Sequence, residues 1–481
     1  MEMQSAMETN PLDAPPVLEL AEVAPRPAHD TKASESAHVT ILKKIDRNAP
    51  EAFVLPPKRG TLKILAKVTC PHCWHSLSPE DVLWVSQHAD LTGDPVLGSD
   101  AASRFLPSRF TVEGRAIDAR DMPCESVACP RCHLTLPRDL LTSDTTFMSI
   151  IGVPASGKSY FLASMTWELR RVLPGKLGLR FSDADPTANI LLNQAEEMLF
   201  LQDDSNVPVK LEKTQTEGGG LYDTIRLGQQ FISLPRPLLF SLKPSANHLQ
   251  GAALEQVSRV LCLYDNAGEH FQPGQYDSAS SPVTQHMARS KVLMFLYDPL
   301  KDARLRALCR SRGSTDPQLD PSVRAYRQET ILNEAANRVR KYTGLPASKK
   351  HDRPLIVIVP KSDVWGPLID LDLSHEPLVP PSTGDGPWSV DVRAIEAISG
   401  RVRAMLREHA PEFVEAAEDF CQTIVYVPVS ALGCGPEKSE QAGGFYVRPR
   451  DITPRWVTVP MLYILAKWSS GLVAVARPAV T

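Results

Sequence analysis

An octet at residues 152–159, GVPASGKS, leaves few folds open to this chain. It fits G-x-x-x-x-G-K-[ST], a pattern in which backbone N–H groups of a glycine-containing loop surround an anion. The apolar run 147–151 precedes the octet as an expected strand, and apolar residues at helical spacing follow it until Pro174-Gly175. Such an octet binds phosphate when it lies between a buried strand and a helix N-terminus.

The residue types of the octet suit the phosphates of a nucleotide. The Lys158 ammonium would reach the β- and γ-phosphate oxygens, and the Ser159 hydroxyl would ligate Mg²⁺. Glycine permits the dihedrals that bring the loop backbone close to the anion. The predicted phosphate-binding residues are Gly152, Ala155, Ser156, Gly157, Lys158, Ser159 and Tyr160.

Beyond residue 145, short apolar runs alternate with helical stretches, which is typical of a parallel sheet covered on both faces. These runs are 147–151, 260–264, 292–297, 355–359 and 424–429. We expect an α/β fold over residues 143–481, a P-loop NTPase domain with a mostly parallel central sheet and insertions. No internal repeat is apparent.

Two C-P-x-C pairs predict a metal site in residues 59–142. Cys70, Cys73, Cys129 and Cys132 each lie on a tight turn, from which all four thiolates can reach one tetrahedral Zn²⁺. The expected unit is a small zinc-ribbon-like module with a long insert. A redox or iron–sulfur role remains open, and the spare candidate ligands are Cys124, His72, His75 and His133.

The remaining N-terminal residues, 1–58, predict a disordered leader rich in Ala, Pro and Glu. Proline is abundant throughout, with 42 in 481 residues, so long irregular connections are expected. The N-terminus lacks the pattern of an export signal. The nine cysteines are odd in number, which favours a reducing compartment and a cytoplasmic location.

Three further motifs follow apolar runs, in chain order. Asp265 to Gly268 form D-x-x-G, in which the carboxylate would hold Mg²⁺ and the glycine peptide would move to meet a γ-phosphate. The segment 360–363, PKSD, follows the fourth run, and 430–432, SAL, follows the fifth.

This ordered set resembles the translation-factor-related class of P-loop GTPases. The resemblance implies that Asp363 accepts hydrogen bonds from the guanine N1 and N2 groups. It also implies that the stem of Lys361 covers the base and that the Ala431 backbone meets the guanine carbonyl, with Ser430 of the same segment among the nucleotide-binding residues. GTP and Mg²⁺ are then the expected cofactors, beside Zn²⁺ in the cysteine module.

The chain departs from that family pattern at three places. Pro360 stands where Asn or Thr is usual, so one contact to the base edge is missing. Glu269 follows the D-x-x-G where many relatives have Gln, which implies slow intrinsic hydrolysis. The switch threonine lies in a long insertion, and Thr214 is preferred over Thr216. The expected catalytic residues are therefore Lys158, Glu269 and Thr214.

The expanded form, with two cysteine knuckles ahead of the octet, resembles the bacterial double-GTPase family associated with conflict systems. That resemblance implies a regulatory GTPase acting with protein partners that are not identified. Two alternatives stay open. One is a non-hydrolysing, nucleotide-gated scaffold that contains zinc, and the other is an ATP-using P-loop protein, which Pro360 favours.

The charge balance gives no strong indication of nucleic-acid binding. Lys and Arg number 52 against 56 Asp and Glu, a formal net charge of −4. A basic stretch, Lys301 to Arg312, is interpreted as a solvated helix face. The apolar stretch 459–476 contains polar interruptions and predicts a buried helix, not a membrane span.

Overall fold

The computed structural model describes residues 64–211, 222–245, 248, 257–266, 271, 282–382, 384, 386–439, 444–469 and 471–476. All of them belong to one compact unit, residues 60–481. The predicted leader at 1–58 lies outside the described residues, as do Thr214, Gly268 and Glu269.

A seven-stranded sheet organises the described part of the chain, in the order β10-β13-β14-β9-β15-β16-β19. Strands β14, β9, β15, β16 and β19 run parallel to one another, whereas β13 is antiparallel to both of its neighbours. The bounds are β9 (Asp144–Gly152), β10 (Leu179–Asp183), β13 (Leu238–Pro244), β14 (Arg259–Asp265), β15 (Val292–Leu296), β16 (Leu355–Val359) and β19 (Ile424–Pro428). The prediction of a mixed α/β fold with a mostly parallel sheet is confirmed.

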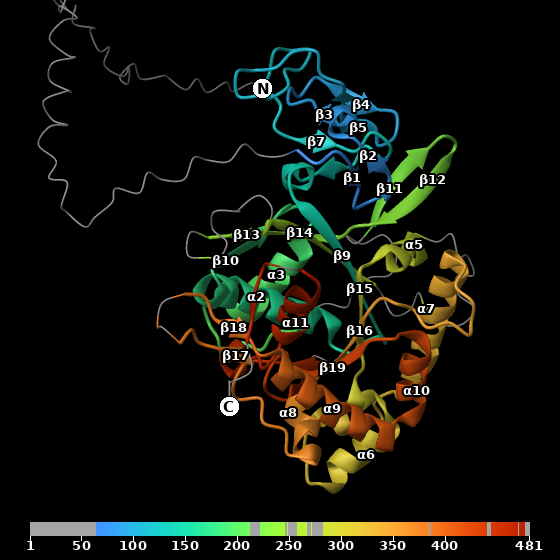
Figure 1. The fold of residues 1–481 in the computed structure, drawn as a ribbon, viewed down its shortest axis with the longest axis vertical. Coiled ribbons are helices and arrows are strands. Elements are labelled where there is room, and N and C mark those ends of the chain that lie inside the picture. The colour runs from blue at the N-terminus through green and yellow to red at the C-terminus, as the bar shows by residue number, and fades with distance from the viewer. Residues whose placement is uncertain are drawn as a thin grey trace, which may run out of the picture. The chain divides into compact units, whose positions relative to one another are not determined.

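Alternating side chains of these strands enter two different cores, as the pleat requires. In β15, Met294 belongs to one core and Phe295 to the other. One core packs against α2 (Lys158–Leu177), α3 (Ile190–Phe200) and α11 (Val459–Trp468), and the other against α5 (Pro282–Arg289), α7 (Gln328–Thr343) and α10 (Pro411–Phe420). Figure 1 shows these two groups of helices on opposite sides of the sheet. Both faces are therefore buried, which explains why the strands read as continuous apolar runs.

Helix α2 corrects one detail of the sequence interpretation. The sequence predicts a helix end at Pro174-Gly175, but the helix continues to Leu177 and ends on Gly178, whose φ is +63°. Proline removes one i→i−4 hydrogen bond and its ring crowds the carbonyl of residue i−4, but near the end of a helix whose apolar side is already packed this cost is tolerated. Leu169, Leu173 and Leu177 are buried on that side.

The remaining helices and short strands complete the sheet unit. The helices are α6 (Ala303–Ser311), α8 (Ser362–Trp365) and α9 (Val392–His409). The short strands form a hairpin, β20 (Glu437–Ser439) with β21 (Gly444–Tyr446), and a small sheet of β17 (Leu378–Val379), β18 (Ser389–Val390) and β22 (Ala474–Val475). A further hairpin, β11 (Tyr222–Leu227) with β12 (Gln230–Pro235), packs its buried side chains against the cysteine-containing N-terminal part of the unit.

The basic stretch 301–312 is not one solvated face. Lys301 and Arg306 are buried, and Arg306 donates to the carbonyls of Asp320 and Val323. Arg304 pairs with Glu412 of α10 at 2.9 Å. Arg306 fixes the segment to the loop that contains Asp320 and Val323, because a buried guanidinium needs acceptors for its N–H groups. Arg304 joins the segment to α10.

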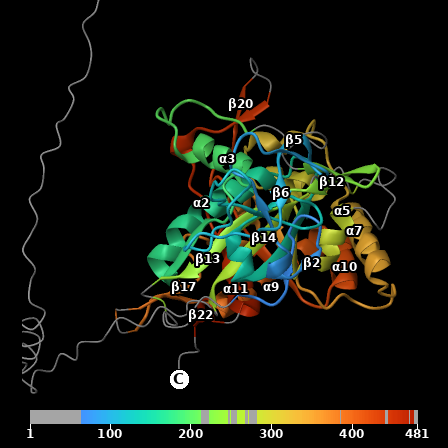
Figure 2. The same cartoon turned by 90° about the horizontal axis from the view of Figure 1, so that it is seen from above.

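The cysteine module consists of short strands and two 3₁₀ turns ahead of β9. The strands are β1 (Val68–Thr69), β2 (Ser76–Leu77), β3 (Leu83–Val85), β4 (Thr92–Asp94), β5 (Gly98–Ala102), β6 (Arg104–Phe105), β7 (Val127–Ala128) and β8 (Thr135–Leu136). Its core is shared with the sheet, since Val260 and Cys262 of β14 pack with the buried cysteines. Figure 2 gives the view from above, in which the module overlies the sheet unit.

Among the described helices, none is long and apolar enough to cross a membrane. Helix α11, which carries the apolar stretch near the C-terminus, is a buried helix of the sheet unit. The expectation of a packed helix there is confirmed.

Candidate functional site

The phosphate loop joins the end of β9 to the start of α2. Ala155 and Gly157 have φ values of +57° and +91°, a left-handed conformation that costs energy at Ala155. Gly152 is closely packed, because a Cβ there would lie 3.0 Å from the Leu296 Cβ. The Ser156 hydroxyl oxygen is buried and has no hydrogen-bond partner among the described residues. Strained backbone, a close approach and an unpaired buried hydroxyl together fit a loop shaped for an anion.

Lys158 connects this loop to the end of the neighbouring strand. Its ammonium lies 2.7 Å from an Asp265 carboxylate oxygen, and both side chains are only 10% exposed. It also donates to the carbonyl of Asn266, whose own backbone and side-chain N–H groups both donate to the Ile150 carbonyl. Because β14 and β9 are adjacent and parallel, the lysine and the carboxylate proposed for Mg²⁺ meet at one sheet edge.

Lys361 and Asp363 follow the adjacent strand β16. Lys361 has a φ of +60°, and its ammonium lies 2.6 Å from a carboxylate oxygen of Asp298, a side chain with no exposed surface. Asp298 follows β15 and exchanges two backbone hydrogen bonds with the side-chain amide of Gln328. The lysine is therefore held by a buried carboxylate that the motif itself did not predict.

The segment that follows β19 reaches the same region. The Ser430 hydroxyl donates to Asp363 at 2.5 Å and accepts from the Gly433 backbone N–H at 2.8 Å. The Ala431 carbonyl accepts from Ser164 of α2 at 2.8 Å. The helix that begins at the phosphate loop thus also anchors the loop expected to face the base.

Two other predicted positions have partners within the chain. The Tyr160 hydroxyl accepts from the Leu211 backbone N–H at 3.0 Å, and burial raises the pKa of that hydroxyl. Pro360 contributes its carbonyl to the Trp365 indole N–H at 2.7 Å. The nucleotide roles of these and the other predicted positions remain predictions.

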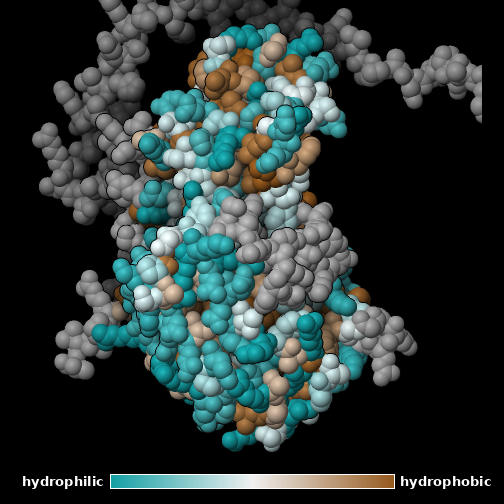
Figure 3. Space-filling model, turned by 90° about the vertical axis from the view of Figure 1, so that its right-hand side faces the viewer, coloured by the Kyte–Doolittle hydropathy of each residue, from teal (hydrophilic) through white to brown (hydrophobic). Residues whose placement is uncertain are grey.

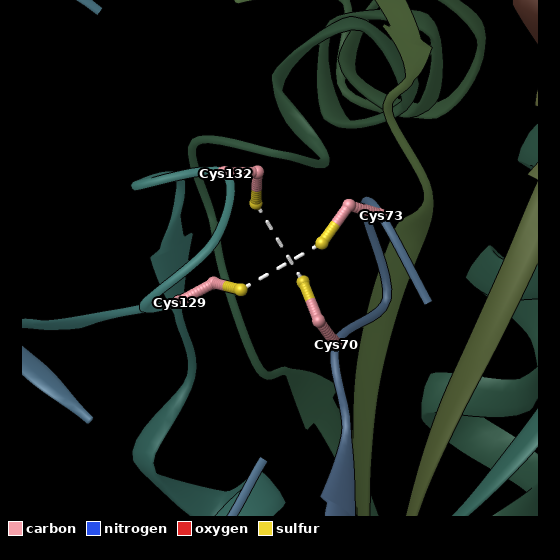
Figure 4. Close-up of side chains that lie close together, drawn as sticks. All are labelled: Cys70, Cys73, Cys129 and Cys132. Atoms are coloured by element: carbon pink, nitrogen blue, oxygen red, sulfur yellow. Dashed lines mark hydrogen bonds between the residues drawn. The ribbon is translucent and has the colours of Figure 1, made fainter. Parts of the chain in front are cut away.

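Four buried cysteine sulfurs form a compact group at the tips of two hairpins. Cys70 and Cys73 come from the β1–β2 turn, and Cys129 and Cys132 from the β7–β8 turn; Figure 4 shows the four side chains converging. All four sulfurs lie within 4.8 Å of one another, and the Cys70–Cys132 and Cys73–Cys129 pairs are 3.8 Å and 3.7 Å apart. A tetrahedral Zn²⁺ with bonds of about 2.3 Å requires sulfurs about 3.8 Å apart. The spacing therefore fits zinc.

The two knuckles are copies of one local structure, 59 residues apart (129 − 70 and 132 − 73). In both, the N–H two residues after the first cysteine donates to its sulfur at 3.4 Å. Trp74 and His133, each directly after the second cysteine, both have a positive φ. A 3₁₀ turn follows each hairpin, η1 (Pro79–Asp81) and η2 (Arg138–Leu141). The module thus contains an internal repeat that the expectation of no repeat missed, because only the cysteines and a few apolar positions match.

The spare ligand candidates lie outside the four-sulfur group. A His72 ring nitrogen lies 3.2 Å from the Thr135 carbonyl oxygen, and His133 contacts Asp94 at 2.7 Å. The Cys124 sulfur is 3.8 Å from the Met122 carbonyl oxygen. Only the four knuckle cysteines therefore form a ligand set within the described residues.

The thiols of the cluster perturb one another strongly. Burial, followed by the neighbouring thiols, raises the pKa of the Cys70 thiol well above its usual range. Hydrogen bonds from Cys132 and Cys70 lower the pKa of Cys129. The protein groups alone thus favour the thiolate form of some of these cysteines at the expense of others, whereas a divalent cation stabilises all four.

The first knuckle contacts the strand that ends at Asp265. The Trp74 indole N–H donates to the Tyr264 hydroxyl at 3.1 Å, and Tyr264 donates to the Pro71 carbonyl. The Tyr264 ring stacks on His286 of α5 at 4.4 Å, and Arg289 of the same helix donates to the Trp74 carbonyl at 3.0 Å. Tyr264, which contacts the cysteine module, therefore directly precedes Asp265, whose carboxylate lies beside the phosphate loop.

A group of exposed apolar side chains lies in the cysteine module. They are Ile64, Leu106, Phe110, Val112 and Met122. Figure 3 shows hydrophobic residues gathered towards the end of the unit that carries this module. Where exposed apolar side chains form a contiguous patch, they occur at protein-binding surfaces.

Comparison with known proteins gives a distant relationship. No family model matches the chain. The chain is 24% identical over 421 residues to a Mycolicibacterium smegmatis protein provisionally named ESX-1 scaffolding and assembly protein SaeC, and the match covers 81% of this chain and 98% of that protein.

Among solved structures, the chain matches P-loop GTPases at low scores. A variant of Era from Aquifex aeolicus bound to GDP and AlF₄⁻ gives a TM-score of 0.17 at 12% identity, with 61% of this chain covered. The S. cerevisiae Ski7 GTPase-like domain bound to GTP gives 0.24 at 12% identity, with 68% covered. The chain spans about half the length of these solved structures, 53% and 51%.

Proposed function

We propose that this chain is a guanine-nucleotide-binding regulatory P-loop GTPase that acts with protein partners and carries a structural zinc site. The observation that carries the proposal is the Lys158–Asp265 contact of 2.7 Å between the phosphate loop and the adjacent strand end. A nucleotide phosphate and its Mg²⁺ would take over these two charges, which are largely buried and already adjacent.

Guanine is the proposed base because a carboxylate and a lysine lie beside the loop after β19. Asp363 accepts from Ser430, and Lys361 is held by Asp298 in a left-handed backbone conformation. An ionised carboxylate is an acceptor only, so it suits the two donors of a guanine edge. Adenine offers no such pair of donors, which makes nucleotide competition a direct test.

In the proposed reaction, water attacks the γ-phosphate of GTP, and this chain supplies positioning and charge. Lys158 would neutralise the β- and γ-oxygens, while Ser159 and Asp265 would hold Mg²⁺, which supplies further charge neutralisation when bound. Thr214 and Glu269, which lie outside the described residues, are the proposed switch and water-orienting groups. A glutamate in that role accepts from water but donates nothing to the transition state, so slow turnover is expected.

The test is competition between GTP and ATP for the purified full chain, followed by single-turnover hydrolysis. We expect GTP to be retained and ATP not to displace it at equal concentration. Lys158→Ala should weaken binding at least about a hundredfold, because it removes charged hydrogen bonds to phosphate. Lys176→Ala, at the other end of α2, is the matched control and should bind as the wild type does. Displacement of GTP by ATP would contradict the guanine assignment.

A non-hydrolysing scaffold is the second candidate, favoured by the exposed apolar residues of the cysteine module. It also agrees with the provisional scaffolding name of the M. smegmatis protein, a relative along most of both chains. In that case the nucleotide would gate partner binding and would not be consumed. Stoichiometric GTP retention without phosphate release over many hours would select this function over the enzymatic one.

A further inference from the structure

A second carboxylate lies near Asp363, in the insert between β15 and α7. Asp316 begins the 3₁₀ turn η6 (Pro317–Leu319), and its Oδ1 accepts from the Gln318 backbone N–H at 2.7 Å. Its Oδ2 is buried and has no hydrogen-bond partner among the described residues. A buried carboxylate oxygen without a donor is costly, so its persistence calls for an explanation.

Three neighbours place Asp316 beside the proposed base site. Its Oδ2 lies against Gly435, just beyond the 430–433 loop, so closely that a Cβ at that glycine would clash with it. Burial raises the pKa of Asp316; the nearby charge of Lys361 opposes this shift, and the charge of Asp363 adds to it. Asp316 therefore lies within electrostatic range of both residues proposed to recognise the base.

The donors of these neighbours are engaged elsewhere in the chain. The Lys361 ammonium contacts Asp298 at 2.6 Å, and the Ser430 hydroxyl donates to Asp363. Pro360, directly before Lys361, has no polar side chain that could donate. A donor for Asp316 Oδ2 would then come from a ligand.

We propose that Asp316 is a specificity-determining residue that accepts a hydrogen bond from the bound guanosine, through its Oδ2. This inference rests on the proposed nucleotide function and deepens it. The shared chemistry of the donor is an N–H or O–H group of the nucleoside, supplied either by the exocyclic amine of the base or by a ribose hydroxyl. In both cases the second carboxylate compensates for the polar side chain that is missing at Pro360.

The test measures GDP binding to the full chain by titration calorimetry. Asp316→Asn keeps an oxygen for the Gln318 N–H but removes the charged acceptor, and it should weaken GDP binding by about ten- to a hundredfold. Asp320→Asn is the matched control, since Asp320 lies in the same insert and its carboxylate accepts from Ser322. That control should bind GDP as tightly as the wild type.

A second variant moves the carboxylate without changing the charge. Gly435→Ala should displace Asp316 Oδ2 and weaken GDP binding in the same direction. Thermal unfolding of each variant, compared with the wild type, reports whether the fold has been retained.

Two analogues distinguish the sources of the donor. If the amine is the donor, the penalty of Asp316→Asn should shrink for IDP, which lacks that amine, and stay unchanged for 2′- and 3′-deoxy-GDP. The reverse pattern identifies a ribose hydroxyl. If the Asp316→Asn protein is folded and binds GDP as tightly as the wild type, the inference about Asp316 is overturned, while the proposed nucleotide function is unaffected. If the wild type binds no guanine nucleotide, both the inference and the proposed function fail.

Discussion

The cysteine site and the phosphate loop differ in how much of the chain each needs. The cysteine site is formed by two hairpin turns that repeat each other, and its four sulfurs already have the spacing of a tetrahedral ion. The phosphate loop has its shape locally, but its lysine, its proposed metal carboxylate and its proposed base contacts come from the ends of several strands. A metal site can thus be built by local turns, whereas a nucleotide site needs the sheet.

The two knuckles also differ from each other in the residue directly after the second cysteine. At these equivalent positions, Trp74 enters the core towards Tyr264, while His133 contacts Asp94 within the module. Burial raises the pKa of the Asp94 carboxyl, but hydrogen bonds from His133 and two backbone amides outweigh it and leave the pKa below its usual value. The first knuckle is therefore attached to the sheet through Trp74. The second knuckle stabilises the segment between the two knuckles through the contact of His133 with Asp94.

The largest effect is expected from removal of the proposed metal. Cys129→Ser should reduce the zinc content of the purified chain from one equivalent to near zero. Because structural zinc contributes on the order of 10 kcal/mol to the folding of a small module, residues 64–141 should become sensitive to protease. Cys124→Ser changes a buried thiol outside the cluster and should retain the metal. Zinc retained at full stoichiometry by Cys129→Ser would show that the cluster is not the metal site.

A smaller effect separates the two knuckles. Trp74→Ala removes a buried indole that contacts Tyr264 and His286, so it should lower the free energy of unfolding by about 3–5 kcal/mol. His133→Ala leaves Asp94 with its backbone donors and should cost about 1–2 kcal/mol. Urea unfolding of both variants measures the difference. Equal destabilisation would mean that the contact with the sheet adds nothing beyond the knuckle itself.

Asp265→Asn tests the contact at the phosphate loop. It removes the charge that faces Lys158, and we expect a decrease of about 1–3 kcal/mol in the unfolding free energy of the nucleotide-free chain. The same variant should lose the Mg²⁺ dependence of GTP binding, since its proposed metal carboxylate is gone. Titration with GTP in the presence and absence of Mg²⁺ gives the answer. An undiminished Mg²⁺ effect would remove Asp265 from the proposed site.

The smallest effect concerns the link between the two regions. Tyr264→Phe keeps the ring but removes the hydroxyl that joins the Trp74 indole to the Pro71 carbonyl. Leaving these two buried groups unpaired should cost about 1–2 kcal/mol in urea unfolding. Tyr463→Phe is the control, because its hydroxyl contacts a partly exposed glutamate, Glu396, and its removal should matter less. A Tyr264→Phe chain that unfolds at the same urea concentration as the wild type would show that the link is not stabilising.

Much of the fold was predictable because its signals are local. The five predicted apolar runs coincide with β9, β14, β15, β16 and β19. Both faces of these strands are covered, so nearly every residue of each run is apolar. Such a run is recognisable in the sequence without knowledge of the neighbouring strands. The end of α2 was missed because packing of the apolar side outweighs the local preference of proline.

Residue spacing along the chain predicted each cysteine knuckle, the strand before the phosphate loop and the helix after it, because each depends on a turn of a few residues. The tertiary structure decided which side chains complete them. Trp74 and Tyr264 are 190 positions apart, Lys361 and Asp298 are 63 apart, and Asp316 reaches Gly435 from a separate insert. These partners meet because strand order places their strand ends and inserts together, and residue spacing along a chain carries no record of that order.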